Sequence, residues 1–435
     1  MFSVRGWMLN IAVFATAANA LADVHYVDVN STNATPPYTN WTTAATNIQD
    51  AVDAAVAGDE IVVTNGIYAT GGRSNYFGST RVAIDKPLEL RSVNGPQYTT
   101  IAGASDGYGI KCVALASNAT LSGFTLTNGV SWHVAGGIGC ESVTAVVSNC
   151  VISGNLGSDF GDGGPVYGGG AYGGTLNNCT LTGNSALADD RAFGGGAYGC
   201  TLNNCTLANN EVAAIYSSYG GGAESCTLNN CVVTGNSASS SIRFSSYYAY
   251  GGGADLCTLT NCTVAGNSVI GGWGGGASAS LLYNCIVSFN TGGGLYGSRA
   301  GSSFFDDPLF LDTNGWANLR LQPNSPCIDA GANARSPAGT DLDGNPRISG
   351  GVVDIGAYEF QLPQLTITPS SANLVLSWPT NNAGYDYTGF TLQSTTNLGS
   401  PAVWSTNSHA PVVMAGQNTV TNPIAGAQKL YRLIH

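Results

Sequence analysis

The chain has 435 residues, more than one ordinary globular core accommodates, so we expect at least two modules. Only 9% of the residues are charged and 60 are glycine, whereas 43% are hydrophobic; this balance excludes a disordered acidic tail and is typical of an all-β exported protein. The net charge of −12 excludes the basic stripe that nucleic-acid binding requires.

Residues 1–22 have the pattern of a signal peptide. Arg5 is basic, the stretch 7–17 is mostly apolar but too short to span a bilayer, and Ala20-Leu21-Ala22 has the small residues of a cleavage site. The mature chain is therefore predicted to begin at Asp23. No later stretch of the sequence reaches the roughly 18 apolar residues of a membrane helix, so we expect no transmembrane span.

A short amphipathic helix is the first clear element of the mature chain. Ile48, Val52 and Val56 recur every fourth residue, and Asn47 is a plausible N-cap. A solenoid needs a cap over its exposed core, and this helix is the candidate.

Internal repeats occupy the middle of the chain. The motif GGGA begins at 168, 194, 220, 251 and 274, with a weaker copy from 136, and an Asn-Cys pair recurs at steps of 29, 26, 26, 31 and 23 residues. Apolar residues alternate within each copy, which indicates short strands joined by tight turns. The repeat predicts an all-β fold, a right-handed parallel β-helix with three short strands per coil over residues 23–305.

The repeated cysteines are predicted to form two inward columns. One holds six of them and the other three: Cys150, Cys179, Cys205, Cys231, Cys262 and Cys285, then Cys200, Cys226 and Cys257. Gly174 and Ser280 replace the shorter column's cysteines in register, so buried free thiols are predicted. Disulfides within a coil remain an alternative, whereas the spacing fits no zinc site and we assign no metal. We also expect a hydrogen-bonded asparagine ladder at the bend: Asn178, Asn204, Asn230 and Asn261.

Variable insertions between each Asn and the next GGGA are rich in aromatic residues. Insertions at one repeat position emerge on one side of a solenoid, and planar rings and arginines suit sugars. The alternative is that the rings pack on one another and cover the sheet. The predicted ligand-binding residues on this side are Trp132, His133, Tyr167, Arg191, Phe193, Tyr216, Tyr219, Arg243, Tyr247, Tyr248 and Trp273.

Candidate catalytic groups are sparse, and we assign no catalytic residue. Residues 136–300 contain no lysine. Asp189, Asp190 and Arg191 are the best candidates if catalysis occurs, and a lone His133 is weaker. Glu224 and Asp255 lie one coil apart and are expected to be an exposed polar pair.

The C-terminal third is predicted to contain two further units. Residues 306–361 are expected to supply terminal coils and a C-terminal cap. Within them Asp341-Leu342-Asp343-Gly344-Asn345 resembles half a calcium loop, but position 12 of such a loop is Val352, so an Asx-turn network is favoured over calcium. Residues 363–435 contain segments in which apolar and polar residues alternate, separated by turn signals, and this pattern predicts a small β-sandwich.

The stretches IQDAVDAAVAGDEIVVTNGIY and DKPLELRSVNG and the GGGA and Asn-Cys repeats resemble the pectin-lyase-like β-helix superfamily. The alternation of GGGA with LTGNSA is similar to the repeats of polymorphic outer membrane proteins, with Leu or Val in place of their Phe. The region 307–359 resembles choice-of-anchor modules, and the tail ending in LYRL resembles a C-terminal module of exported Verrucomicrobia proteins.

The resemblance implies a β-helix that is secreted or held at the outer membrane or surface of a bacterium, with 363–435 as a sorting or anchoring module. The superfamily holds lyases, hydrolases and adhesins. The recurring aromatic insertions and the absence of the lysine and acidic clusters of lyases favour a non-catalytic protein that binds polysaccharide or a partner and needs no cofactor. The alternative is a polysaccharide lyase or glycoside hydrolase acting on an acidic glycan.

Overall fold

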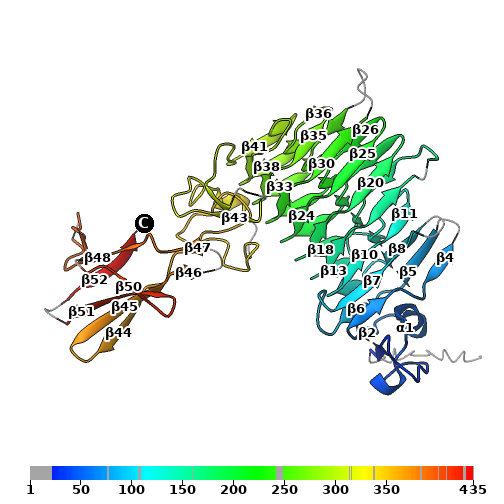
Figure 1. The fold of residues 1–435 in the computed structure, drawn as a ribbon, viewed down its shortest axis with the longest axis horizontal. Coiled ribbons are helices and arrows are strands. Elements are labelled where there is room, and N and C mark those ends of the chain that lie inside the picture. Colours follow the sequence, from blue (N-terminus) through cyan, green and yellow to red (C-terminus); the bar gives the residue numbers. More distant parts are fainter. Residues whose placement is uncertain are drawn as a thin grey trace, which may run out of the picture.

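The computed structural model describes residues 22–434 except 76–77, 106–108, 160, 242–247, 313, 315, 337–338, 383–384, 400, 408 and 425–427. Its main body is a stack of coils whose short strands pair in parallel with the equivalent strands of the next coil (Figure 1). The chain is therefore a right-handed parallel β-helix, followed by a small antiparallel β module, and the predicted fold class is confirmed.

One coil illustrates the architecture. Its strands are β18 (Thr175–Asn177), β19 (Thr180–Thr182), β20 (Ser185–Ala188), β21 (Arg191–Phe193) and β22 (Ala197–Tyr198). They belong in turn to five sheets that we call A, B, D, E and C, which have 11, 9, 6, 5 and 10 strands among the described residues. The prediction of three strands per coil is therefore wrong for the central coils, because the insertions form the strands of sheets D and E rather than loops.

Two separate cores run along the stack. The main core lies inside sheets A, B and C. Side chains alternate along each strand, and those on the inner side, such as Leu176 and Leu181, form this core. A narrower core lies between sheets D and E and consists mostly of alanine and valine: Val166, Ala186, Ala188, Ala192, Val212, Ala214, Ala238, Ala249 and Val269. Small side chains let these two sheets approach closely, so the insertions form a thin lobe beside the main solenoid.

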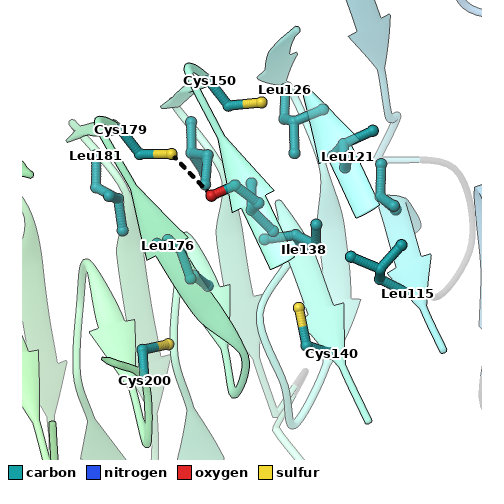
Figure 2. Packing of buried hydrophobic residues seen from close by; sticks show 14 of the residues in the cluster. Leu115, Leu121, Leu126, Ile138, Cys140, Cys150, Leu176, Cys179, Leu181 and Cys200 are labelled. Atoms are coloured by element: carbon teal, nitrogen blue, oxygen red, sulfur yellow. Dashed lines mark hydrogen bonds between the residues drawn. The ribbon is translucent and has the colours of Figure 1, made fainter. Parts of the chain in front are cut away.

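All twelve cysteines are buried and free, as expected for the repeat columns. Figure 2 shows Cys150 and Cys179 stacked along one side of the main core, with Cys140 and Cys200 on the opposite side. The thiols also take part in hydrogen bonds: Cys179 N donates to Cys205 Sγ at 3.4 Å. Where Ser280 replaces a cysteine in register, its hydroxyl accepts from Cys257 N at 3.0 Å. Where the position holds cysteine or serine, it thus has a small side chain that accepts a hydrogen bond, and Gly174 shares only the small volume.

The buried asparagine ladder is formed by different residues from those predicted. Asn178, Asn204, Asn230 and Asn261 have φ near +52° and make the bend between sheets A and B, and only part of this set is linked side chain to side chain. The continuous ladder is formed by the asparagines that follow sheet B: Asn155, Asn184, Asn210, Asn236, Asn267 and Asn290. Each side-chain amide donates to the next Oδ1 at 2.9–3.0 Å.

The N-terminal helix α1 (Ile48–Ala54) begins as predicted, because Asn47 Oδ1 accepts from Asp50 N at 3.0 Å. Ile48 and Val52 are buried in the main core, and α1 lies at the N-terminal end of the stack (Figure 1). Val56, predicted on the same face, lies beyond the end of the helix and is exposed.

Among the described residues of 306–361 there are two strands, β42 (Phe310–Asp312) and β43 (Asn318–Leu321), which are antiparallel. They pack against the outer face of sheet B through Ile286, and Ala357 N donates to Thr263 Oγ1 at 3.0 Å. These contacts lie along the flank of the last coils, which corrects the expectation of further coils here. Asp341 accepts from the backbone of Asp343, Asn345 and Glu359, so its oxygens serve an Asx-turn network.

The C-terminal module has two main antiparallel sheets. Their strands are β44 (Thr366–Ser370), β45 (Asn373–Pro379), β51 (Gln417–Pro423) and β50 (Val412–Met414), then β49 (Ser405–Thr406), β48 (Thr391–Thr395) and β52 (Leu430–Ile434). Trp378 of one sheet and Leu392 of the other share one buried cluster, so the sheets pack as a small sandwich. Phe360 joins the same cluster and ties the module to the preceding segment.

Candidate functional site

A row of aromatic rings runs along the outer face of sheet E, one ring per coil. The sheet E ring row consists of Tyr167, Phe193, Tyr219, Tyr250 and Trp273, from β16 (Val166–Tyr167), β21, β26 (Ser217–Tyr219), β31 (Ala249–Tyr250) and β36 (Gly272–Trp273). The alternate residues, such as Ala192, point into the narrow core. Period-two alternation therefore places every ring on the same side.

The rings of this row cover one another. Centroids of successive rings from Tyr167 to Tyr250 are 5.0–5.6 Å apart, with interplanar angles of 8–13°. A sugar cannot stack on ring faces that neighbouring rings already occupy, which is the packing alternative recognised from the sequence. The edges and hydroxyl groups remain available along the row, and Trp273 at its end is 40% exposed.

Sheet C contributes a second row that faces the first across a sharp turn. Its outward residues in register are Tyr172, Tyr198, Glu224, Asp255, Ser278 and Tyr296. Tyr198 meets Tyr167 edge-on with centroids 4.9 Å apart, and Trp273 stacks on Tyr296 at 5.4 Å. We call the angle between the two rows the aromatic corner.

The GGG run makes this corner possible. Gly220 has φ of +66°, and a Cβ on it would lie 2.8 Å from the Cβ of Glu224. Only glycine allows the chain to turn this tightly from sheet E into sheet C. The repeated GGGA therefore reflects the geometry of the corner, coil after coil.

Two carboxyl groups are buried in the corner. Glu224 and Asp255 are each 3% exposed, so the expectation of an exposed polar pair is wrong. Glu224 Oε1 accepts from Ser225 Oγ at 2.8 Å, whereas Oε2 is buried and has no hydrogen-bond partner within the described part of the chain. Burial, reinforced by the charge of Asp255, raises the pKa of Glu224 to about 7. Burial also raises the pKa of Asp255 to about 6, against a hydrogen bond from Ser278.

Lys111 lies beside the sheet C row near its N-terminal end. Its Nζ lies 3.1 Å from the position that a Cβ on Gly139 would take, and Gly139 pairs in register with Tyr172. Burial lowers the pKa of Lys111 to about 8. Lys111 precedes the repeats of residues 136–300 in sequence, but its side chain reaches over Gly139, in a strand of the following coil.

Trp132 and His133 lie at the N-terminal end of the lobe. Their rings stack with centroids 5.1 Å apart. His133 Nε2 is 3.0 Å from Asp162 Oδ2, and Nδ1 is 3.0 Å from the Pro165 carbonyl oxygen. Both ring nitrogens therefore contact the loop that contains Asp162 and Pro165, and these contacts support a structural role for His133.

The other predicted residues are spread over the lobe. Arg191 pairs with Asp190 at 3.1 Å, and this carboxylate, with smaller contributions from the Tyr219 and Tyr167 hydroxyls, raises the pKa of the guanidinium. Tyr248 packs on Trp273 with centroids 4.5 Å apart. Tyr216 is partly exposed on the lobe. Arg243 and Tyr247 lie outside the described residues.

Asp189, the third acidic candidate, lies at a different place. Its backbone N donates to Asp159 Oδ2 at 2.7 Å, and it lines a hollow of about 350 Å³ with Leu187 and Ile215 at the edge of the lobe. Asp189, Asp190 and Arg191 thus serve the lobe surface and do not converge on the buried acid pair.

Sequence reasoning missed the aromatic residues that sheet C supplies: Tyr172, Tyr198 and Tyr296. The first two follow GGGA directly, at the same repeat position as Glu224 and Asp255. Aligning this single position across the copies would have revealed a mixed aromatic and acidic column.

Within the described ranges, no three His, Cys, Asp or Glu side chains converge into a group that could hold a metal ion. Among the described helices, none has the length and apolar character to cross a membrane.

No protein-family model matches the chain, and no curated protein matches it. Similar solved structures include the pectate lyase Pel9A, at 15% identity and a TM-score of 0.47, covering 79% of this chain and 97% of that one. A rhamnogalacturonan lyase has 11% identity and a TM-score of 0.40, covering 70% and 94%. A polygalacturonase from Erwinia carotovora ssp. carotovora has 13% identity and a TM-score of 0.27, covering 67% and 97%. The class of this chain rests on its own strand order, which is that of a parallel β-helix protein.

Proposed function

We propose that this chain is an exported β-helix protein that binds polysaccharide along the aromatic corner. The observation that carries the proposal is the pair of facing rows, which repeats polar-edged rings over successive coils. Because ring faces are mutually covered, the ligand is held by the Tyr219 and Tyr250 hydroxyl edges and by the exposed terminal rings Trp273 and Tyr296. A linear glycan lying parallel to the solenoid axis would meet the same groups in each coil.

The test is a Tyr219→Phe and Tyr250→Phe double variant, assayed first on a glycan array and then by calorimetry with the best ligand. Phenylalanine already occupies the row at Phe193, so the fold should be kept while two hydroxyl groups are lost. Each lost hydrogen bond contributes roughly 0.5–1.5 kcal/mol, so affinity should fall about fivefold or more.

Two control variants accompany this test. Trp273→Ala should also weaken binding, whereas Trp41→Ala removes a similarly exposed tryptophan far from the corner and should have no effect. Unchanged affinity in the double variant and in Trp273→Ala would contradict the proposed binding surface.

A second candidate is a polysaccharide-degrading enzyme, and the buried acid pair favours it. A carboxyl group that keeps its proton near neutral pH can act as a general acid, and Lys111 with a lowered pKa can act as a base. Release of reducing ends lost in Glu224→Gln would support a hydrolase. Formation of unsaturated uronate lost in Lys111→Gln would support a lyase, and neither product with any glycan that binds would leave binding as the function.

A further inference from the structure

Asp23 is the first described residue whose backbone N–H and carbonyl oxygen both form hydrogen bonds with the folded body. Its carbonyl oxygen accepts from Glu60 N at 3.0 Å, where β1 (Val24–Val27) begins to pair with β2 (Glu60–Val63). Its N–H donates to Asp59 Oδ1 at 3.0 Å. Ala22 and the Asp23 side chain are exposed, so the peptide bond between them is accessible.

The acceptor of this bond is a buried carboxylate. Asp59 is 4% exposed, and its Oδ2 accepts from Val56 N at 2.7 Å and contacts His25 Nε2 at 3.0 Å. His25 is itself buried, and its Nδ1 lies 2.6 Å from the Pro37 carbonyl oxygen. Among the described residues, the Asp23 N–H is the partner found for Oδ1. A buried carboxylate is costly unless it is well paired, so this oxygen favours a cationic donor.

We propose that removal of the leader between Ala22 and Asp23 creates an α-ammonium group that forms an ion pair with Asp59 and locks the first strand of the solenoid. A leader-cleaving peptidase hydrolyses the Ala22–Asp23 peptide bond with one water. The carboxylate stays on Ala22, and the amine on Asp23 takes up a proton. The inference rests on the predicted cleavage site and is independent of the proposed glycan binding.

The physical consequence follows from the change of donor. An amide N–H becomes an ammonium group at the same place, and a hydrogen bond from a charged donor to a carboxylate is about twice as strong as a neutral one. The gain is local, because β1 is the first strand of sheet A: β2 pairs with it on one side, and on the other side the connecting segment bonds to it, through Tyr38 O and Ala45 N at Tyr26. The processed chain should therefore open less often at its N-terminal end than an unprocessed one.

The experiment compares two purified chains, one beginning at Asp23 and one at Ala22. Both carry one terminal ammonium, but the second displaces it by a residue and leaves an amide at Asp23. Hydrogen exchange of the β1 amides, followed by mass spectrometry, should be about three- to tenfold slower in the chain that begins at Asp23. A peptide from the central strand β24 (Thr206–Ala208) serves as internal reference and should exchange equally in both chains.

The same comparison is repeated in Asp59→Asn, which removes the acceptor charge. Asp59→Asn will loosen β1 in both chains, so the deciding quantity is the ratio between the two N-termini, which should fall to about one. Equal exchange of the two chains with Asp59 intact would overturn the proposal. So would a mass showing that the chain exported from its cell does not begin at Asp23.

Discussion

Glu224 and Asp255 are two acids whose protonation the aromatic corner changes. Burial raises both pKa values, so the folded state keeps protons that the unfolded chain has lost, between pH 3.8 and about 6 at Asp255 and between pH 4.5 and about 7 at Glu224. Stability falls with rising pH wherever the folded state binds more protons. The pair therefore destabilises the fold progressively as the pH rises towards 7, and fully above it.

Glu224→Gln should remove most of this penalty. Glutamine keeps the shape of the side chain and cannot ionise. At pH 8 the free energy of unfolding of the variant should therefore exceed that of the wild type by up to about 3 kcal/mol, and the variant should melt at a higher temperature. At pH 4.5 the two should melt together. Thermal unfolding at both pH values checks this, with the exposed Glu211→Gln as a control that should show no pH-dependent difference. A variant less stable than the wild type at pH 8 would contradict the assignment.

Cys205 illustrates why the thiol columns tolerate serine. Its Sγ accepts from Cys179 N and donates to Asn203 O at 3.3 Å, and Ser303 in the same column accepts from Cys285 N at 3.1 Å. Cys205→Ser should therefore cost less stability than Cys205→Ala, which leaves a buried N–H without an acceptor at about 1–2 kcal/mol. Melting temperatures of the two variants decide between them, and the reverse order would show that apolar volume alone matters.

At the scale of elements, the strands of sheets A, B and C could be predicted because their alternation and tight turns recur at a fixed period. Sheets D and E could not, because the insertions vary in length and sequence and only their alanine and valine positions face the narrow core. The same holds for the ladder: Asn204 and Asn210 look equivalent in the sequence, but only the fold shows which side chain points inward.

The two asparagines of this coil should respond differently to substitution. Asn204 makes the bend with φ of +52°, and its buried Oδ1 meets no hydrogen-bond partner among the residues described, so Asn204→Gly should change stability by less than about 1 kcal/mol. Asn210 accepts from Asn184 and donates to Leu181 O and Asn236 Oδ1. Asn210→Ala leaves several buried groups unpaired and should cost on the order of 3 kcal/mol. Chemical denaturation compares them, and similar losses would contradict the ladder.

At the scale of the whole molecule, the strands of each central coil pair only with those of the two neighbouring coils, so a complete coil should be removable. Deleting residues 194–219 takes out 26 residues and joins Phe193 to Gly220 at the start of the next GGGA. The shortened chain should fold, because stability in such arrays is nearly a sum over repeats and their interfaces. Phe193 would then stack on Tyr250. Far-ultraviolet circular dichroism and thermal melting measure the outcome.

The matched control deletes residues 194–206 only. This change joins sheet E directly to sheet B and leaves a gap in sheets A and C, so the protein should lose its cooperative melting. If both deletions behaved alike, the coil would not be the unit of this structure.

The aromatic corner depends both on single residues and on the register of whole strands, and the sequence predicted it only in part. The rings of sheet E were found because insertions at one repeat position must emerge together. Their mutual stacking depends on strand register, and the burial of Glu224 depends on the tight glycine turn. Lys111 reaches the row from an earlier coil, a relation that no local pattern contains.

The asparagine ladder has an electrical consequence. Backbone amides of a parallel coil point alternately up and down the stack, as Asn209 N donates to Thr234 O while Glu211 N donates to Asn184 O. Their dipoles largely cancel. Each ladder amide donates forward to the next Oδ1 and back to a carbonyl of the preceding coil, but the side-chain carbonyls all accept from the Asn155 side, so their dipoles add. Each amide polarises the next, and the stack acquires a positive and a negative end along its axis.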